Sequence, residues 1–179
     1  MNLKFPEGFV WGTSTAAAQV ETASNHPWRG LKARDGYVFN RTTDHEKRRS
    51  EDAAFILRFG NIYRCGVDWS RLQAEPYAKF DKKVAAEYRS FFETLQKGGV
   101  RIMFVLHHFA HPNWFEEAGG WTKDENIPMF LDFAKQCIKH FSEYAAYWNT
   151  FNEPNVYAMN AFILGNFPPF KKGRYFSAN

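Results

Sequence analysis

An amide and a carboxyl stand side by side at Asn152-Glu153, after the aromatic stretch Tyr147-Trp148 and directly before Pro154. A neutral carboxyl in this place can protonate the leaving oxygen of a glycosidic bond, while the amide hydrogen-bonds a ring hydroxyl. Proline disfavours the helical region for the residue that precedes it, so we expect Glu153 on extended backbone at a strand end. The motif therefore predicts carbohydrate chemistry at the end of an apolar strand.

Size and charge leave few other function classes. The 179 residues suffice for one domain with a sizeable core, and we expect residues 1–179 to form that domain. Aromatic residues make up 18% of the chain, which suits a packed α/β core or a sugar-stacking site. The net charge is a mild +4, and the clusters at residues 47–49 and 171–172 indicate solvated faces rather than a nucleic-acid surface.

The chain carries no sign of export or of a membrane segment. No apolar run approaches the roughly 18 residues that cross a bilayer. The N-terminal residues 1–6 lack the apolar stretch of a secretory signal. Two isolated cysteines, Cys65 and Cys137, indicate reduced thiols. We therefore expect a cytoplasmic protein that binds neither membranes nor nucleic acids.

Strand-like and helix-like segments alternate along the chain. Strands are expected at residues 9–15, 62–69, 101–108 and 146–153. Helices are expected at residues 44–59, 81–97, 127–145 and 156–164, from apolar residues at i, i+3 and i+4 and from glycines at their ends. Four strand–helix units in succession predict a parallel sheet.

Two parallel architectures fit this pattern: an open doubly wound sheet, or the first half of a (β/α)8 barrel. No glycine-rich phosphate motif follows any expected strand, which weakens the nucleotide-binding form of the first. Arg64, Gly66 and Asp68 alternate on one face of the second strand, an unusual pattern inside an open sheet. In a barrel that face points inward, towards a site at the carboxyl ends of the strands. The second strand therefore favours a half-barrel of four βα units.

With these residues in view, the chain resembles the N-terminal half of a family 1 glycoside hydrolase, the β-glucosidase and β-galactosidase family. The matching segments occur in family order from residue 5 to about residue 173. They are Phe5-Pro6-Glu7-Gly8-Phe9-Val10-Trp11-Gly12, Ala16-Ala17-Ala18-Gln19-Val20-Glu21, Tyr63-Arg64 with Trp69-Ser70-Arg71, Val105-Leu106-His107-His108-Phe109, Gly119-Gly120-Trp121 and Trp148-Asn149-Thr150-Phe151-Asn152-Glu153-Pro154.

The resemblance implies a role for each matching polar residue. Glu153 corresponds to the general acid/base, and Asn152 to the residue that holds the 2-hydroxyl of the sugar. Gln19 and His108 correspond to residues that hydrogen-bond other hydroxyls of the terminal sugar. Arg64 corresponds to an arginine beside the nucleophile. We add Trp121 as a residue that lines the cleft, and we expect a β-glycoside or monosaccharide as ligand, with no cofactor and no metal.

The nucleophile is the main departure from the family pattern. In the family it is a second glutamate in a Glu-Asn-Gly context, and this chain contains no such sequence. A retaining glycosidase needs two carboxyl groups about 5–5.5 Å apart. We therefore expect the acid/base half of a β-glycosidase site, with little or no turnover by the chain alone. The alternative is a non-catalytic sugar-binding or truncated remnant of the family.

Two other groups of residues allow alternative interpretations. His107, His108 and His111 suggest a metal site, but adjacent strand residues point to opposite faces, so a structural role is favoured. Arg64 has an alternative partner in Asp68, four residues on, as an inward ion pair.

A half-barrel leaves its edges open. Four strands cannot close a barrel that needs eight, so the first and fourth strands become edges that invite pairing with another chain. The partner is a second copy or a complementary half-barrel, unless loops fold over the gap. We expect the isolated chain to self-associate.

Overall fold

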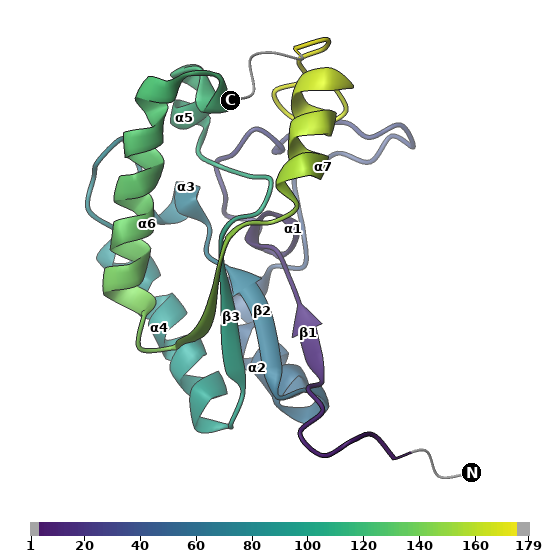
Figure 1. Cartoon of the computed structure of the whole chain (residues 1–179), viewed down its shortest axis with the longest axis vertical. Coiled ribbons are helices and arrows are strands. Elements are labelled where there is room, and N and C mark those ends of the chain that lie inside the picture. Colours follow the sequence, from purple (N-terminus) through teal and green to yellow (C-terminus); the bar gives the residue numbers. More distant parts are fainter. Residues whose placement is uncertain (1–3, 175–179) are drawn as a thin grey trace.

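A computed structural model describes residues 4–174. It contains one parallel sheet in the order β1-β2-β3-β4, made of β1 (Gly12–Ser14), β2 (Ile62–Gly66), β3 (Arg101–His107) and β4 (Ala145–Phe151). Neighbours in the chain are neighbours in the sheet, as in a barrel and unlike a doubly wound sheet. This order confirms the predicted half-barrel of four βα units (Figure 1).

Three long helices cover one face of the sheet: α2 (His45–Phe59), α4 (Lys82–Lys97) and α6 (Ile127–Phe141). Asp81 caps α4 by accepting a hydrogen bond from the Val84 N–H at 2.9 Å. On β3, alternate residues enter the same apolar core as these helices, namely Ile102, Phe104 and Leu106. The hydrophobic core therefore lies between the sheet and its helices.

Short helices gather at the carboxyl ends of the strands (Figure 1). They are α1 (Ala17–Val20), α3 (Trp69–Leu72), α5 (Asn113–Glu117) and α7 (Pro154–Ala158), with single turns at Gly120–Thr122 and Asp124–Asn126 and a π-helix at Met159–Ile163. This end of the sheet is where parallel βα folds place their functional loops.

The second strand is shorter than expected. Asp68 and Trp69 do not belong to it, because the Asp68 carboxylate accepts hydrogen bonds from the N–H groups of Ser70 at 2.8 Å and Arg71 at 3.3 Å and so begins α3. The expected common face of Arg64, Gly66 and Asp68 is therefore wrong at Asp68. The alternating strand pattern predicted that β2 continues to residue 69, but the strand ends at Gly66 because Asp68 is the N-cap of α3.

Other boundaries also move by a few residues. The first strand covers only Gly12–Ser14, because only these residues pair with β2. The third and fourth strands end at His107 and Phe151, and α6 ends at Phe141 rather than residue 145. The last helix starts at Pro154, two residues before the predicted start, because proline is favourable in the first turn.

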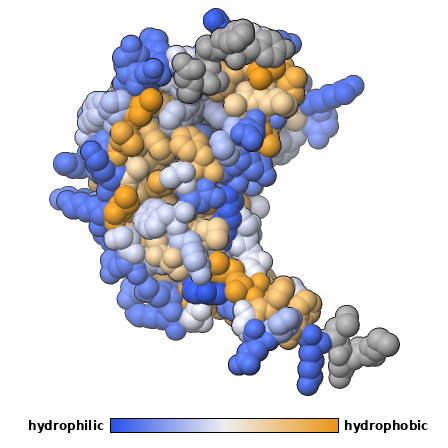
Figure 2. All heavy atoms as spheres, viewed as in Figure 1, coloured by the Kyte–Doolittle hydropathy of each residue, from blue (hydrophilic) through white to orange (hydrophobic). Residues whose placement is uncertain are grey.

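The edges of the sheet expose apolar side chains. All of β1 and most of β4 is exposed, including Tyr147 and Trp148. The two flanking helices α2 and α6 also expose large apolar residues: Phe55, Leu57, Phe59, Ile127, Leu131 and Ile138. Figure 2 shows such residues reaching the surface over α6 and near the N-terminal segment, on a molecule whose outline is hollowed beside β1. Across residues 4–174, every helix is too short or too polar to cross a bilayer.

Candidate active site

Arg64 and Asn152 meet at the carboxyl end of the sheet. The Arg64 guanidinium donates a hydrogen bond to Asn152 Oδ1 at 2.6 Å, joining β2 to the residue that follows β4. Asn152 is buried, and its backbone N–H donates to the His107 carbonyl at 2.8 Å. The alternative ion pair between Arg64 and Asp68 is absent among the described residues, because Asp68 is committed to α3. Asn152 is therefore fixed from both the side chain and the backbone.

Gln19 and His108 line one cavity of about 180 Å³, whose lining does not include Arg64, Asn152 or Glu153. Arg64 is close enough to His108 to act on its charge. Gln19 comes from α1 and His108 follows β3, so the tertiary fold brings them together. The remaining walls are apolar and mostly aromatic: Ala18, Trp28, Phe39, Phe109 and Phe167. Few polar groups among aromatic walls are typical of a site for a small ring. The aromatic contributions of Trp28, Phe39 and Phe167 were not predicted, because they come from loops that carry no periodic signal.

The imidazole of His108 is neutral at ordinary pH. Burial, and to a smaller extent the positive charge of Arg64, lower the pKa of His108 to about 4. A neutral imidazole has one N–H donor and one nitrogen acceptor, so it can hydrogen-bond a hydroxyl in either direction. This protonation state suits a sugar ligand.

Glu153 lies in the left-handed region of backbone space, with φ 43° and ψ 60°. The prediction of extended backbone is therefore wrong. Pro154 begins α7, so Glu153 must turn the chain from strand to helix within one residue, and its carbonyl accepts from the Tyr157 N–H at 3.0 Å. Positive φ is costly for a residue with a side chain and clusters at functional sites. The side chain is exposed, whereas a carboxyl that donates a proton near neutral pH is normally buried.

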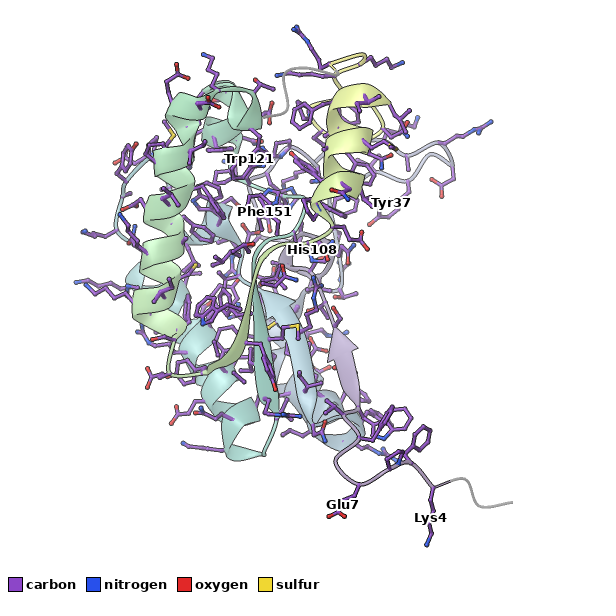
Figure 3. All side chains as sticks on the ribbon, viewed as in Figure 1. Lys4, Glu7, Tyr37, His108, Trp121 and Phe151 are labelled. Atoms are coloured by element: carbon purple, nitrogen blue, oxygen red, sulfur yellow. The ribbon has the colours of Figure 1, made fainter. Side chains whose placement is uncertain are left out.

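Trp121 lies outside the cavity that Gln19 and His108 line, although it lines a separate pocket with residues 118 and 122–126, and its role in the cleft stays a prediction. Its ring packs against Phe115, Phe130 and Phe151, with centroids 5.0–5.1 Å apart. Figure 3 shows Trp121 beyond Phe151, away from His108. It packs at the end of the core, because α5 and α6 place the apolar side chains of Phe115 and Phe130 against it.

His107 and His108 occupy different environments, as strand geometry predicted. His107 is buried among Trp121, Phe151 and Tyr157, whereas His108 faces the cavity. Within residues 4–174, no three side chains of His, Cys, Asp or Glu gather in a way that could hold a metal ion.

A buried ionic cluster beneath α1 was not predicted. The Glu21 carboxylate contacts the guanidinium groups of Arg71 and, at 3.7 Å, Arg49, and accepts a hydrogen bond from the Tyr88 hydroxyl at 2.6 Å. Glu87 bridges both arginines at 3.2 and 3.3 Å. Arg49 is thus buried, and the interpretation of residues 47–49 as a solvated face is wrong for that residue. The only sign of this cluster in the sequence was that Glu21, the partner of Arg49, lies two residues from Gln19.

The ionic cluster holds α1, and through it Gln19. Burial raises the pKa of Glu21 to about 7, with the nearby Asp68 acting in the same direction, although both arginines and Tyr88 favour the anion. The Glu21 N–H caps α1 by donating to the Ala17 carbonyl at 2.8 Å. A helix of four residues has little stability of its own, so these contacts fix its place.

Comparison with known proteins identifies the family. The family model described as glycosyl hydrolase family 1 matches residues 1–178. The 6-phospho-β-galactosidase of Lacticaseibacillus casei is 31% identical over 98% of this chain, which covers 38% of that protein. β-Glucosidase 1 of Arabidopsis thaliana is 30% identical over 92% of this chain and 34% of its own length.

Solved structures agree. The β-glycosidase from Pyrococcus horikoshii superposes with a TM-score of 0.84 and 30% identity, over 96% of this chain and 41% of that one. The Thermotoga maritima β-glucosidase in complex with castanospermine gives a TM-score of 0.86 and 26% identity, over 94% and 41%. The chain spans about two-fifths of the length of the relatives it matches. It belongs to glycosyl hydrolase family 1.

Proposed function

We propose that this chain provides the acid/base half of a retaining β-glycosidase site. The observation that carries this proposal is the convergence of Gln19 and His108 on one aromatic cavity, with Arg64 close enough to His108 to lower its pKa and itself bonded to Asn152. These four side chains come from, or follow, all four strands and suit the hydroxyls and apolar face of a sugar ring. Membership of glycosyl hydrolase family 1 and the names of the β-glycosidase relatives support the same reaction class.

Each residue has a distinct role in the proposed reaction. Glu153 protonates the glycosidic oxygen as the bond to the anomeric carbon breaks. Because Arg64 occupies Asn152 Oδ1, the Asn152 amide is oriented with its N–H₂ group available to the 2-hydroxyl. Gln19 and His108 hydrogen-bond other hydroxyls. A second carboxylate, about 5–5.5 Å from Glu153, attacks the anomeric carbon in retaining enzymes, and the Glu-Asn-Gly context of the family nucleophile is absent from this sequence.

The nucleophile must then come from another polypeptide segment that completes the barrel. The open edges support this part of the proposal. A groove of about 260 Å³ runs between β1 and α2, lined by Thr13, Phe55, Ile56, Phe59 and other residues, where a closed barrel places its next βα unit. On the opposite edge, Tyr147 and Trp148 of β4 are exposed. The solved neighbours are (β/α)8 barrels, and this chain corresponds to about 40% of each.

Two further points belong to the proposal. The chain forms one partial-barrel domain with the proposed bounds 1–179, supported within residues 4–174 by a single sheet whose helices enclose the large core, while the ends of that range lie outside the described residues. The compartment is the cytoplasm, since Cys65 and Cys137 are free and buried. Burial raises the pKa of the Cys137 thiol and keeps it protonated and unreactive.

The test combines binding with turnover. For the purified chain we expect weak, saturable binding of glucose by NMR titration and no hydrolysis of an aryl β-glucoside. Gln19→Ala and His108→Ala each weaken binding, whereas Glu153→Gln leaves it unchanged, because the acid acts on the leaving group. If glucose affinity is unchanged in both Gln19→Ala and His108→Ala, the proposed sugar site is wrong. Turnover that survives Glu153→Gln contradicts the role of Glu153.

A further inference from the structure

The chain leaves β3 through an unusual backbone conformation at Phe109. This residue follows His108 directly and lies in the left-handed region, with φ 63°. Such a conformation is rare for a bulky side chain and persists only where the surrounding structure holds it. Glu153 makes the same kind of turn after β4, where α7 holds it because the Glu153 carbonyl accepts from the Tyr157 N–H. Phe109 has no such helix, since α5 begins only at Asn113.

Trp28, in the first long loop, holds the turn at Phe109 instead. Its indole Nε1–H donates to the Phe109 carbonyl at 2.6 Å, between residues 81 positions apart in sequence. Within residues 4–174, this is the only hydrogen bond that reaches the backbone of residues 108–111. The segment that carries His108 is therefore tied to the rest of the molecule by one hydrogen bond.

The Trp28 ring is itself held by aromatic contacts. It meets the ring of Phe167 edge to face, with centroids 5.0 Å apart and an interplanar angle of 63°, and it lies 6.4 Å from the ring of Phe39. Both phenylalanines come from loops and line the same cavity as Trp28, Gln19 and His108. These two contacts fix the direction in which the indole N–H points.

The Phe109 ring forms part of the cavity wall, and its place depends on the same backbone turn. The ring stacks on Tyr157, with centroids 5.8 Å apart and an interplanar angle of 12°. It also contacts the rings of Phe167 at 5.5 Å and His108 at 5.1 Å. Because φ rotates the chain about the N–Cα bond, a negative φ at Phe109 would separate this ring from its partners or move His108.

We propose that Trp28 is a positioning residue of the cavity: its indole N–H holds the Phe109 carbonyl, keeps Phe109 in the left-handed region and so places the His108 imidazole and the Phe109 ring in the wall. Trp28 acts through Phe109 and is not catalytic. The bond also engages the only polar atom of the Trp28 side chain. The indole therefore offers a ligand only its apolar surface, and the polar side chains that line the cavity are Gln19 and His108.

Trp28→Phe tests the bond, because phenylalanine keeps an aromatic ring and lacks the N–H. Phe109→Gly supplies the matched background, since glycine adopts the left-handed region without help. If Trp28 acts on the backbone of residue 109, Trp28→Phe should have a large effect with phenylalanine at that position and little effect with glycine. A Trp28 that only packs, or that contacts the ligand directly, has the same effect in both backgrounds.

The first measurement is NMR of the whole chain without ligand. In wild type, the Trp28 indole N–H should exchange slowly with solvent, whereas that of Trp11, which is 49% exposed, exchanges fast. A Trp28 indole that exchanges as fast as that of Trp11 overturns the proposal, and this result requires no variant to fold. The imidazole signals of His108 should move in Trp28→Phe and move clearly less when the same change is made in Phe109→Gly. Equal movement in both backgrounds also overturns it.

The second measurement is glucose affinity, and this consequence rests on the proposed function. Trp28→Phe should weaken binding about fivefold in the wild-type background, the loss expected for one hydrogen bond, and should have little effect in Phe109→Gly. Trp114→Phe is the control, because the Trp114 indole also donates to a backbone carbonyl, that of Gln73 at 3.2 Å, and lies outside the cavity. It should leave the affinity unchanged.

The two proposals fail in different ways. An equal loss of glucose affinity from Trp28→Phe in both backgrounds means that Trp28 contacts the sugar directly, and the positioning role is wrong. If the wild-type chain binds no glucose, the proposed sugar site is wrong, while the ligand-free spectra still decide the role of Trp28.

Discussion

Arg64 and Asn152, 88 residues apart in sequence, share a hydrogen bond of 2.6 Å from the guanidinium to the amide oxygen. The bond fixes which end of the Asn152 amide is free. The oxygen is engaged, so the N–H₂ group is the end of the amide left to serve the proposed ligand. The contact between β2 and the residue after β4 thus leaves Asn152 with a hydrogen-bond donor rather than an acceptor.

Asn152→Asp tests this orientation. The carboxylate keeps an acceptor for Arg64 and gains a charge-assisted bond, so the free energy of unfolding should not fall. The donor to the sugar is lost, and a hydrogen bond is worth about 1 kcal/mol, so glucose affinity should fall about five- to tenfold. Urea unfolding and NMR titration measure the two effects. Asn155→Asp, an exposed change three residues away, is the control and should alter neither.

Asp68→Ala tests the N-cap of α3. The substitution removes the bonds to the N–H groups of Ser70 and Arg71, and should cost about 0.5–2 kcal/mol of unfolding free energy. Exposed Glu51→Ala is the control, with an effect near zero. Because Asp68 does not pair with Arg64, the effects of Asp68→Ala and Arg64→Met should add. Strong non-additivity in this double-mutant cycle would show that Asp68 and Arg64 interact, as the alternative ion pair requires.

Glu21 should make stability depend on pH. Its folded pKa of about 7 lies above the ordinary 4.5, so the folded state binds the proton more tightly than the unfolded state. The contribution of Glu21 to stability is therefore complete below pH 4.5 and is lost as pH rises through about 7, a change of roughly 3 kcal/mol.

Glu21→Gln removes this dependence. The variant cannot titrate and resembles protonated Glu21, so it should match wild type near pH 4.5 and exceed it in stability by roughly 3 kcal/mol at pH 7. Urea unfolding of both proteins between pH 4.5 and 7 measures the difference, in which the other titrating groups cancel. Parallel pH curves would show that Glu21 stays ionised throughout, held by the arginines.

The β1/α2 groove should drive self-association of the isolated chain. Phe55 and Phe59 line it and are each 61% exposed. Replacing both with Glu places charge on the apolar edge, so the average mass at high concentration should fall towards that of a monomer. Analytical ultracentrifugation measures this mass. Ser50→Glu with Ala54→Glu, on exposed positions of the same helix, should leave association unchanged. A wild-type chain that stays monomeric contradicts the expectation.

Local patterns in the sequence predicted the elements well. The i, i+3, i+4 spacing of α4 and α6 and the apolar run of β3 identified the elements, because burial on one or two faces leaves its period in the sequence. Boundaries were less certain. Asp68 ended β2 and Pro154 started α7 through local hydrogen bonds and backbone limits that compete with the periodic pattern.

The sequence by itself determined the parallel βα order, the likeness to family 1 glycoside hydrolases and the residue types for handling a sugar. Only the tertiary structure decided their relations. It paired Arg64 with Asn152 rather than Asp68, turned Glu153 into the left-handed region and placed Trp121 in the packing of the core. It also buried Arg49 with Glu21 and linked His111 to Glu116. These relations join residues on separate elements, and their energies depend on distance and burial, which no sequence spacing contains.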